Sequence, residues 1–186
     1  QTKFPLSCKS ISGRVCAVAP SISGKIGSKG LTNFYQAKSG FKSVKLRAPV
    51  GRPGKILGIG LNYRDHAKET GREPPTTQMW FNKQATCLHG PFDPVLMPAV
   101  SSALDYEVEL VAVIGKGGKH ISAADAPAAI FGYCVGNDVT ERMWQHAVPQ
   151  WSLGKSFDTH APMGPWIVTA DELGDPHDLG IRCYVN

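Results

Sequence analysis

The sequence predicts a mostly β domain with short helices, in the α+β class. Residues 104–116 alternate between apolar and polar side chains with the period of two that is typical of a strand. Several shorter apolar runs are bounded by Gly and Pro, which favours further strands joined by turns. Helical character is limited to a few short segments, so no long helix is expected.

The composition is that of an ordinary globular protein. At 186 residues the chain is long enough for one domain with a sizeable core, or for one domain and an arm. No apolar run approaches the roughly 20 residues that are needed to span a bilayer, so no membrane contact is predicted. The five cysteines are scattered and lack CxxC spacing, which favours reduced thiols over disulfides or a zinc site.

Charge is segregated along the chain. Residues 1–64 hold 12 Lys and Arg and no Asp or Glu, whereas residues 65–186 hold 8 basic and 15 acidic residues. A basic, Ser-rich beginning is typical of an organellar transit segment or of an arm that binds nucleic acid. The basic residues are spread out and have few aromatic stacking partners, such as Phe34 and Tyr35, which argues against nucleic acid. We predict a cytoplasmic protein, with a mitochondrial location as the alternative.

Two regions are expected from this composition. Residues 1–44 have only short apolar runs, so we predict a basic, weakly specified arm with at most a short strand or two. The domain is expected to begin near Val44 and to cover residues 45–186. Its first predicted strands are residues 45–50 and residues 55–60, and the second of these ends in glycine.

A polar segment with helical character follows, from about Tyr63 to Glu69. His66 and Glu69 are three residues apart and therefore share one face of a helical turn. A carboxylate beside an imidazole orients it and raises its basicity, as in a general base. For this pair alone, a surface His and Glu on a solvated helix is the simpler interpretation. Residues 71–75 have the composition of a hinge that could let the segment close over a site.

Residues 78–82 and 93–98 are predicted strands, and residues 104–116 form the central one. Glu107 and Glu109 point to the same face of that strand and lie about 7 Å apart. Two like charges in a half-buried place repel each other and are costly to desolvate, and a divalent cation would remove both problems. The alternative is that these glutamates mark the solvated end of a strand.

Two more charged residues occupy informative positions. Asp138 follows an apolar strand at residues 133–135 and precedes a polar helical turn, where an Asp most often caps a helix. Lys155 lies within an apolar stretch, so it either extends to solvent or directs a partly buried charge at an anionic group. The remaining predicted elements are a short helix capped by Ser122 and strands at residues 163–169 and 180–186.

Together, five stretches resemble the fumarylacetoacetate hydrolase family over about residues 45–186. They are GLNYRDHAKETG, LDYEVELVAVIGK, GYCVGNDVTERMWQ, WSLGKSFDTHAPMGPW and DPHDLGIRCYVN, in the family's order and spacing. The likeness is greatest to the small single-domain branch, whose members act on acylpyruvates, oxaloacetate and related 2-oxo acids. The resemblance implies a roll of mixed β-sheets around a metal ion, with few helices.

The resemblance also implies roles for the residues at matching positions. Glu107 and Glu109 match two glutamate metal ligands, and Asp138 matches a third carboxylate ligand. His66 and Glu69 match a dyad on a mobile lid that activates water or moves a proton. The residues at substrate-facing positions are Lys155, Arg142, Gln145 and Thr159.

The chemistry of these groups agrees with the implied roles. Three carboxylates without Cys or His form a hard oxygen site, which suits Mg²⁺ or Mn²⁺. A 2-oxo acid chelates such an ion, which stabilises the enolate formed when a neighbouring C–C or C–H bond breaks. Lys155 and Arg142 would hold the anionic ends of the substrate, and His66 would move the proton. Acylpyruvate hydrolysis, oxaloacetate decarboxylation and keto–enol tautomerisation share this first half, so the sequence leaves all three open.

The sequence stops at Asn186, whereas family domains continue. We therefore expect a β-roll that is incomplete at the C-terminus, in which residues 180–186 lack a partner strand. The alternative function is a non-catalytic family member or fragment that serves as a binding or assembly module. For a full-length protein we expect a homodimer.

Overall fold

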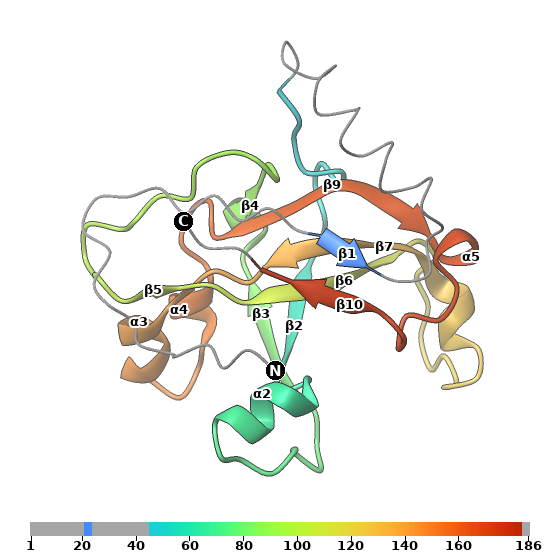
Figure 1. Cartoon of the computed structure of the whole chain (residues 1–186), viewed down its shortest axis with the longest axis horizontal. Helices are drawn as coiled ribbons and strands as arrows, with labels where there is room; N and C mark the ends of the chain where they lie inside the picture. Colours follow the sequence, from blue (N-terminus) through green and yellow to red (C-terminus); the bar gives the residue numbers. More distant parts are fainter. Residues whose placement is uncertain (1–20, 24–44, 184–186) are drawn as a thin grey trace.

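The centre of the molecule is a curled four-stranded sheet (Figure 1). The computed structural model describes residues 21–23 and 45–183. The strand order is β4-β9-β7-β6, in which β4 runs parallel to β9 and the other neighbours are antiparallel. This architecture confirms the predicted mostly β fold with short helices. The strands are β4 Leu88–His89, β6 Val108–Ile114, β7 Ile130–Asn137 and β9 Ala161–Thr169.

Three antiparallel strand pairs accompany the central sheet. The pair of β2 and β3 leads into the segment that carries His66, and the pair of β5 and β8 lies beside the carboxylates of interest. The third pair corrects part of the expectation that residues 180–186 lack a partner, because β10 pairs with β1 over residues 180–182. Residues 184–186 lie outside the described residues. These strands are β1 Ser21–Ser23, β2 Ile56–Gly60, β3 Met79–Lys83, β5 Leu104–Asp105, β8 Thr140–Glu141 and β10 Gly180–Arg182.

The helices are short and lie at the ends of strands. In Figure 1, α2 stands below the β2–β3 pair, and α3 and α4 lie together beside β5. Within the described part of the chain, no helix has the length and apolar character needed to cross a membrane. The helices are α2 Arg64–Glu69, η2 Ala85–Cys87, η3 Ala126–Ala129, α3 Arg142–Ala147, α4 Ser152–Lys155 and α5 Ala170–Leu173.

Strand β7 is one of the two internal strands of the sheet, with β6 on one edge and β9 on the other. Tyr133, Cys134 and Val135 on this strand are buried. Gly136 permits the close approach of β6, since a Cβ there would lie 2.7 Å from the Val111 side chain. The buried apolar run of β7 therefore fixes the position at which the strand ends, one residue before Asp138.

Two predicted strands are absent, and proline accounts for both. Residues 45–50 include Pro49 and are irregular, and so are residues 93–98, which include Pro94 and Pro98. A proline has no backbone N–H to give to a neighbouring strand.

At Leu96, side chains of the core form hydrogen bonds with the backbone groups that a neighbouring strand would otherwise bind. The Leu96 N–H donates to Thr159 Oγ1 at 2.9 Å, and the Leu96 carbonyl lies 3.1 Å from His160 Nε2. Residues 93–98 therefore follow the surface of the core without joining a sheet.

The predicted strand at residues 104–116 is divided into β5 and β6. Glu107 leaves the regular ladder, because its N–H donates to the Asn137 side chain at 2.9 Å and its carbonyl accepts from Asp138 N at 2.8 Å. The predicted helix after Ser122 shortens to the single turn of η3, in which Pro127 is the second residue, and β7 begins immediately afterwards.

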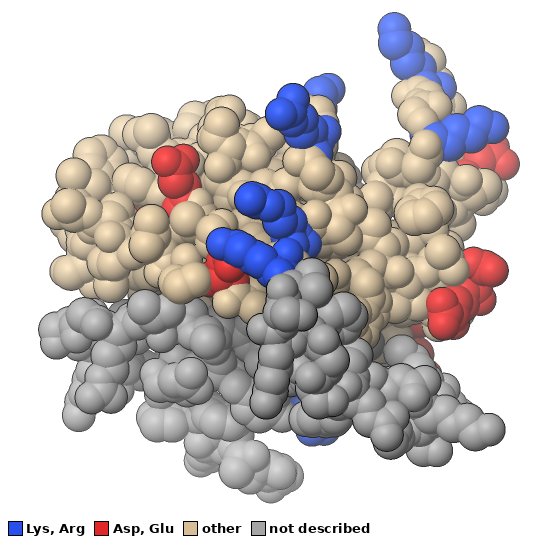
Figure 2. Space-filling model, turned by 90° about the horizontal axis from the view of Figure 1, so that it is seen from above, with Lys and Arg blue, Asp and Glu red and all other residues tan. Residues whose placement is uncertain are grey.

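The predicted arm at residues 1–44 lies outside the described residues, apart from β1. On the face shown in Figure 2, the Lys and Arg side chains of the described part stand in separate groups, with acidic groups among them and at the edge. That face carries no continuous basic stripe in its described part, which is the feature that a nucleic-acid backbone would follow.

Candidate functional site

Three carboxylates meet at one end of the β6–β7 pair. Glu107 and Glu109 lie where the chain enters β6, and Asp138 directly follows the last residue of β7. Because the two strands are antiparallel and Val108 pairs with Asn137, the start of one strand lies beside the end of the other. One ligand oxygen from each of the three carboxylates lies within 4.8 Å of the other two. The structure thus brings together the three residues that the sequence predicted.

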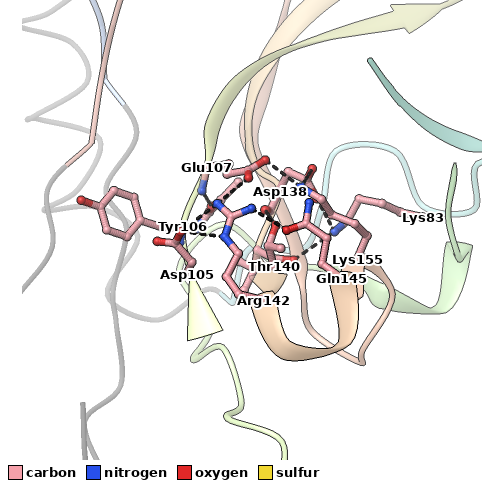
Figure 3. Close-up of polar contacts among 11 residues, drawn as sticks. Lys83, Asp105, Tyr106, Glu107, Asp138, Thr140, Arg142, Gln145 and Lys155 are labelled. Carbon is pink, nitrogen blue, oxygen red and sulfur yellow. Dashed lines mark hydrogen bonds and ion pairs between the residues drawn. The ribbon is translucent and has the colours of Figure 1, made fainter. Parts of the chain in front are cut away.

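Three cations surround this carboxylate cluster (Figure 3). The Lys155 ammonium donates to Glu107 Oε2 at 2.7 Å and to Asp138 Oδ2 at 2.6 Å. The Lys83 ammonium binds the other oxygen of Asp138 at 2.6 Å and also donates to the Val139 carbonyl at 3.2 Å. Both oxygens of Asp138 are therefore held by lysines.

Burial makes these ion pairs important for the local geometry. The side chains of Lys83, Asp138 and Lys155 are 2–5% exposed. Removing one partner of such a pair leaves a buried charge uncompensated, at a cost of about 3–5 kcal/mol. Lys155 also lies over the Phe81 ring, 5.0 Å from its centroid. The prediction that Lys155 directs a buried charge at an anionic group therefore agrees with its contacts.

Glu109 differs from the other two carboxylates because no ion pair to a described cation involves it. Burial raises the pKa of Glu109 to about 8, and the neighbouring charges of Asp138 and Glu107 add to this effect. Buried carboxylates repel one another, and Glu109 has no paired cation among the described residues to offset the repulsion from the other two. A divalent cation would supply that charge, and three carboxylate oxygens are suitable ligands for Mg²⁺ or Mn²⁺. The residues present therefore fit a hard divalent ion.

Arg142, at the start of α3, is held by protein groups on three sides. Its guanidinium contacts Asp105 Oδ2 at 2.7 and 2.9 Å, Glu107 Oε1 at 2.6 Å and Gln145 Oε1 at 2.8 Å. Burial would lower the pKa of Arg142, but Glu107 and Asp105 outweigh it and raise the pKa. Two of the predicted substrate-facing residues, Arg142 and Gln145, are thus joined to the carboxylate cluster.

The other predicted site residues lie outside this network. His66 and Glu69 are exposed on α2, and within the described residues no hydrogen bond or ion pair joins either of them to the carboxylates or to each other. Thr159 uses its hydroxyl to accept from Leu96 N and has a φ of +72°. The structure therefore assembles six of the nine predicted site residues and leaves these three apart from them.

Several residues of the network were not predicted from the sequence. Lys83 is the last residue of β3 and directly follows the strand predicted at residues 78–82, a signal similar to the one that drew attention to Asp138. Asp105 precedes Glu107 by two residues and so continues the same alternation. The amide of Asn137 and the phenol of Tyr63, which accepts from Leu110 N at 2.9 Å, gave no signal, because their role depends on backbone groups across the fold.

Comparison with known families agrees with this geometry. Residues 55–186 match the family described as fumarylacetoacetate (FAA) hydrolase C-terminal. The chain belongs to the fumarylacetoacetate hydrolase family. The resemblance seen in the sequence is therefore confirmed over most of the predicted domain.

Relatives and solved structures show how far the likeness extends. The chain is 48% identical over 145 residues to oxaloacetate tautomerase FAHD2A, mitochondrial, of Homo sapiens, which covers 77% of this chain and 46% of the relative. It is 42% identical over 166 residues to the fumarylacetoacetate hydrolase domain-containing protein 2 homolog of Dictyostelium discoideum, covering 84% of this chain and 54% of the relative. The chain spans about half the length of the curated relatives it matches.

Among solved structures, a 2-hydroxyhepta-2,4-diene-1,7-dioate isomerase from Mycobacterium marinum is 38% identical with a TM-score of 0.60. That match covers 70% of this chain and 46% of the other. The described fold is thus that of the fumarylacetoacetate hydrolase family.

Proposed function

We propose that this chain carries the site of an enzyme that acts on small 2-oxo acids with a divalent cation, Mg²⁺ or Mn²⁺. The observation that supports this most is the convergence of Glu107, Glu109 and Asp138 within 4.8 Å, surrounded by buried cations. The oxygen-only donor set suits a hard ion, and membership of the fumarylacetoacetate hydrolase family supports an enzyme.

Keto–enol tautomerisation is the reaction that we favour among acylpyruvate hydrolysis, oxaloacetate decarboxylation and tautomerisation. The human relative is named an oxaloacetate tautomerase, and the Mycobacterium marinum structure is named an isomerase. Both names describe a rearrangement within one molecule. Such a reaction requires the site to move a proton and to stabilise the anion formed in between, without splitting the substrate.

The charged residues have complementary parts in this proposal. The ion would be held by the three carboxylates and, when bound, would act as a Lewis acid toward the keto oxygen. Lys155 and Arg142 provide positive charge on either side of Glu107, where a substrate carboxylate can bind. Gln145, which is hydrogen-bonded to Arg142, and Thr159 offer polar groups to the substrate oxygens.

Proton transfer is assigned to α2 in this proposal. His66 accepts a proton from the carbon beside the keto group and delivers it to the enolate oxygen, which gives the enol; in the reverse direction it takes the hydroxyl proton and returns it to the carbon. Glu69 lies one turn further along α2 and would orient the imidazole. Since both side chains are exposed, α2 must move toward the carboxylates when substrate binds.

We further propose a mitochondrial location in preference to a cytoplasmic one, and a homodimer as the assembly. The relative is named as mitochondrial, and the acid-free basic composition of residues 1–44 is compatible with a transit segment.

Substitution of a single carboxylate tests the metal site. Glu109→Gln is the most suitable variant, because Glu109 forms no ion pair with a described cation whose loss would disturb the fold. We expect Mg²⁺ and Mn²⁺ to bind at least ~100-fold more weakly, measured by calorimetry, and turnover to fall with it. The matched control is Glu172→Gln on the exposed helix α5, which should behave as the unchanged protein.

Turnover is measured for the three candidate reactions. Ultraviolet absorbance follows the enol form of oxaloacetate, pyruvate formation reports decarboxylation, and acylpyruvate loss reports hydrolysis. Equal metal affinity in the Glu109 variant and the unchanged protein would refute the metal site. Metal binding without turnover of any of the three would favour the non-catalytic binding module.

A further inference from the structure

Glu141, on β8, is a completely buried carboxylate that no described cation neutralises. Its Oε1 atom accepts two hydrogen bonds, one from Ala103 N at 2.9 Å and a short one from the Ser101 hydroxyl. Its Oε2 atom is buried and has no hydrogen-bond partner among the described residues. Glu141 is next to Arg142 in sequence but takes no part in the ion pairs of that residue.

Such a residue contributes little to stability. Burying a carboxylate oxygen without a partner costs free energy, and apolar replacements of buried charges are often neutral or stabilising. The two bonds that Glu141 accepts have a different consequence, because they fix the course of one segment. They bind residues 101–103, which lead directly into β5.

This segment is fastened to β8 at several points. Besides the bonds to Glu141, the Ala103 carbonyl accepts from Arg142 N at 2.9 Å. Leu104 then pairs with Glu141, and Asp105 pairs with Thr140. The pair of β5 and β8 has only two residues in each strand, so its backbone bonds alone define its position weakly. Glu141 extends the attachment to the residues that precede β5.

The position of β5 decides where Asp105 holds Arg142. Asp105 uses both carboxylate oxygens, one accepting from Tyr106 N at 2.9 Å and the other from the Arg142 guanidinium at 2.7 and 2.9 Å. The Asp105 carboxylate is therefore fixed by the backbone that directly follows β5. Any shift of that strand would be passed to the guanidinium.

We infer that Glu141 is a positioning residue, which fixes the Arg142 guanidinium through residues 101–105 and the Asp105 carboxylate. Glu141 acts at a distance, since none of its hydrogen bonds reaches Arg142's side chain. Its importance for substrate binding rests on the proposed function, in which Arg142 binds the substrate carboxylate. Its effect on the orientation of Arg142 does not depend on that function.

Three substitutions separate positioning from support of the fold. Glu141→Ala removes both acceptors, whereas Glu141→Gln keeps an oxygen where Oε1 accepts its bonds. Ser101→Ala removes one donor at a half-buried position and leaves the carboxylate in place. Glu172→Gln, on the exposed α5, is the control for a change of charge elsewhere.

The direct readout is the Arg142 Nε–H signal in a nitrogen-15 spectrum, assigned by its loss in Arg142→Lys. We expect Glu141→Ala to increase its exchange with solvent about tenfold or more, as a held group becomes mobile. Ser101→Ala should change it in the same direction by less, and Glu141→Gln should keep it near that of the unchanged protein. If Glu141→Ala does not fold, the Ser101→Ala result decides.

The second readout is kinetic. For a 2-oxo acid that the unchanged protein turns over, Glu141→Ala should raise KM about tenfold, with kcat changed by less than about threefold. In an Arg142→Lys background the same substitution should no longer raise KM. With Arg142 in place, Glu141→Ala should leave the Mg²⁺ affinity within about twofold of that of the unchanged protein.

Two results would overturn the inference. One is an unchanged Arg142 signal in both Glu141→Ala and Ser101→Ala, and the other is an equal rise of KM with and without Arg142. If the unchanged protein turns over no 2-oxo acid, the proposed function fails. The Arg142 signal then still decides whether Glu141 positions the guanidinium.

Discussion

His160 is completely buried, and its imidazole has a hydrogen-bond partner at one nitrogen only. Nε2 donates to the Leu96 carbonyl at 3.1 Å, which assigns the ring proton to that atom. Nδ1 is buried and has no partner among the described residues. Burial lowers the pKa of His160 below its usual value, and the bond to Leu96 only partly opposes this. The folded protein therefore favours the neutral ring more than the unfolded chain does.

This pKa shift predicts a loss of stability in mild acid. Below the usual pKa of about 6.5 the unfolded chain protonates the imidazole more readily than the folded protein does, so the free energy of unfolding falls as pH decreases. His160→Phe should make the fall in the free energy of unfolding below pH ~6.5 less steep, measured by urea unfolding at several pH values. The exposed His177→Gln is the control, and an equal fall in the His160 variant would contradict the prediction.

At the level of single residues, most charged groups of the site were predictable from the sequence, but several of the residues that bind them were not. The spacing of Glu107 and Glu109 and the place of Asp138 after a strand are local features, and the resemblance added their common purpose. The roles of Lys83 and Asn137 depend on groups that are 55 and 30 residues away along the chain. No local pattern states which of several buried polar residues will meet.

Helix α2 is the element that the proposed mechanism requires to move. Of its residues only Ala67 is buried, so the helix contributes little to the core. Tyr63 fixes its beginning, because the phenol oxygen accepts from Leu110 N at 2.9 Å, one residue beyond Glu109. Tethering at one end with exposed charges elsewhere suits a segment that closes on a site.

Substitution of His66 tests this arrangement. His66→Ala should reduce turnover by roughly 10²–10⁴, because a proton carrier is lost, and should leave Mg²⁺ affinity unchanged. Lys68→Ala, on the same exposed helix, is the matched control. Hydrogen exchange of residues 62–75 should be fast and should slow when a 2-oxo acid binds. Full activity of the His66 variant would exclude it as the proton carrier.

At the level of elements, strands were predictable where the alternation of side chains, or a short buried apolar run, fitted a strand and no other element. The strands near residues 56–60, 79–83 and 161–169 were found in this way, within two residues at each end. The apolar residues at 45–50 and 93–98 gave a similar signal, but their prolines lack the donors for a ladder. Their paths are fixed by contacts with the core, which a local pattern does not contain.

The whole molecule depends on pairings between distant segments. The central sheet joins β4, β6, β7 and β9, and β1 takes no part in its pairing. The convergence of the carboxylates follows from the β6–β7 pairing alone. The mixed direction of the sheet, with β4 parallel to β9, was implied only by the family resemblance.

Removal of residues 1–44 tests whether the domain begins near residue 45, as we propose. The deletion removes β1, which is the described partner of β10, but leaves every described pair of the central sheet and the β2–β3 pair intact. We therefore expect Mg²⁺ affinity within about twofold of the full chain, since no metal-site contact that we describe involves β1. The backbone amides of Gly180–Arg182 should exchange faster with solvent, because their edge loses its partner. Deletion of residues 1–20 alone keeps β1 and should leave that exchange unchanged. Aggregation or unfolding of the 45–186 protein would show instead that the arm belongs to the folded domain.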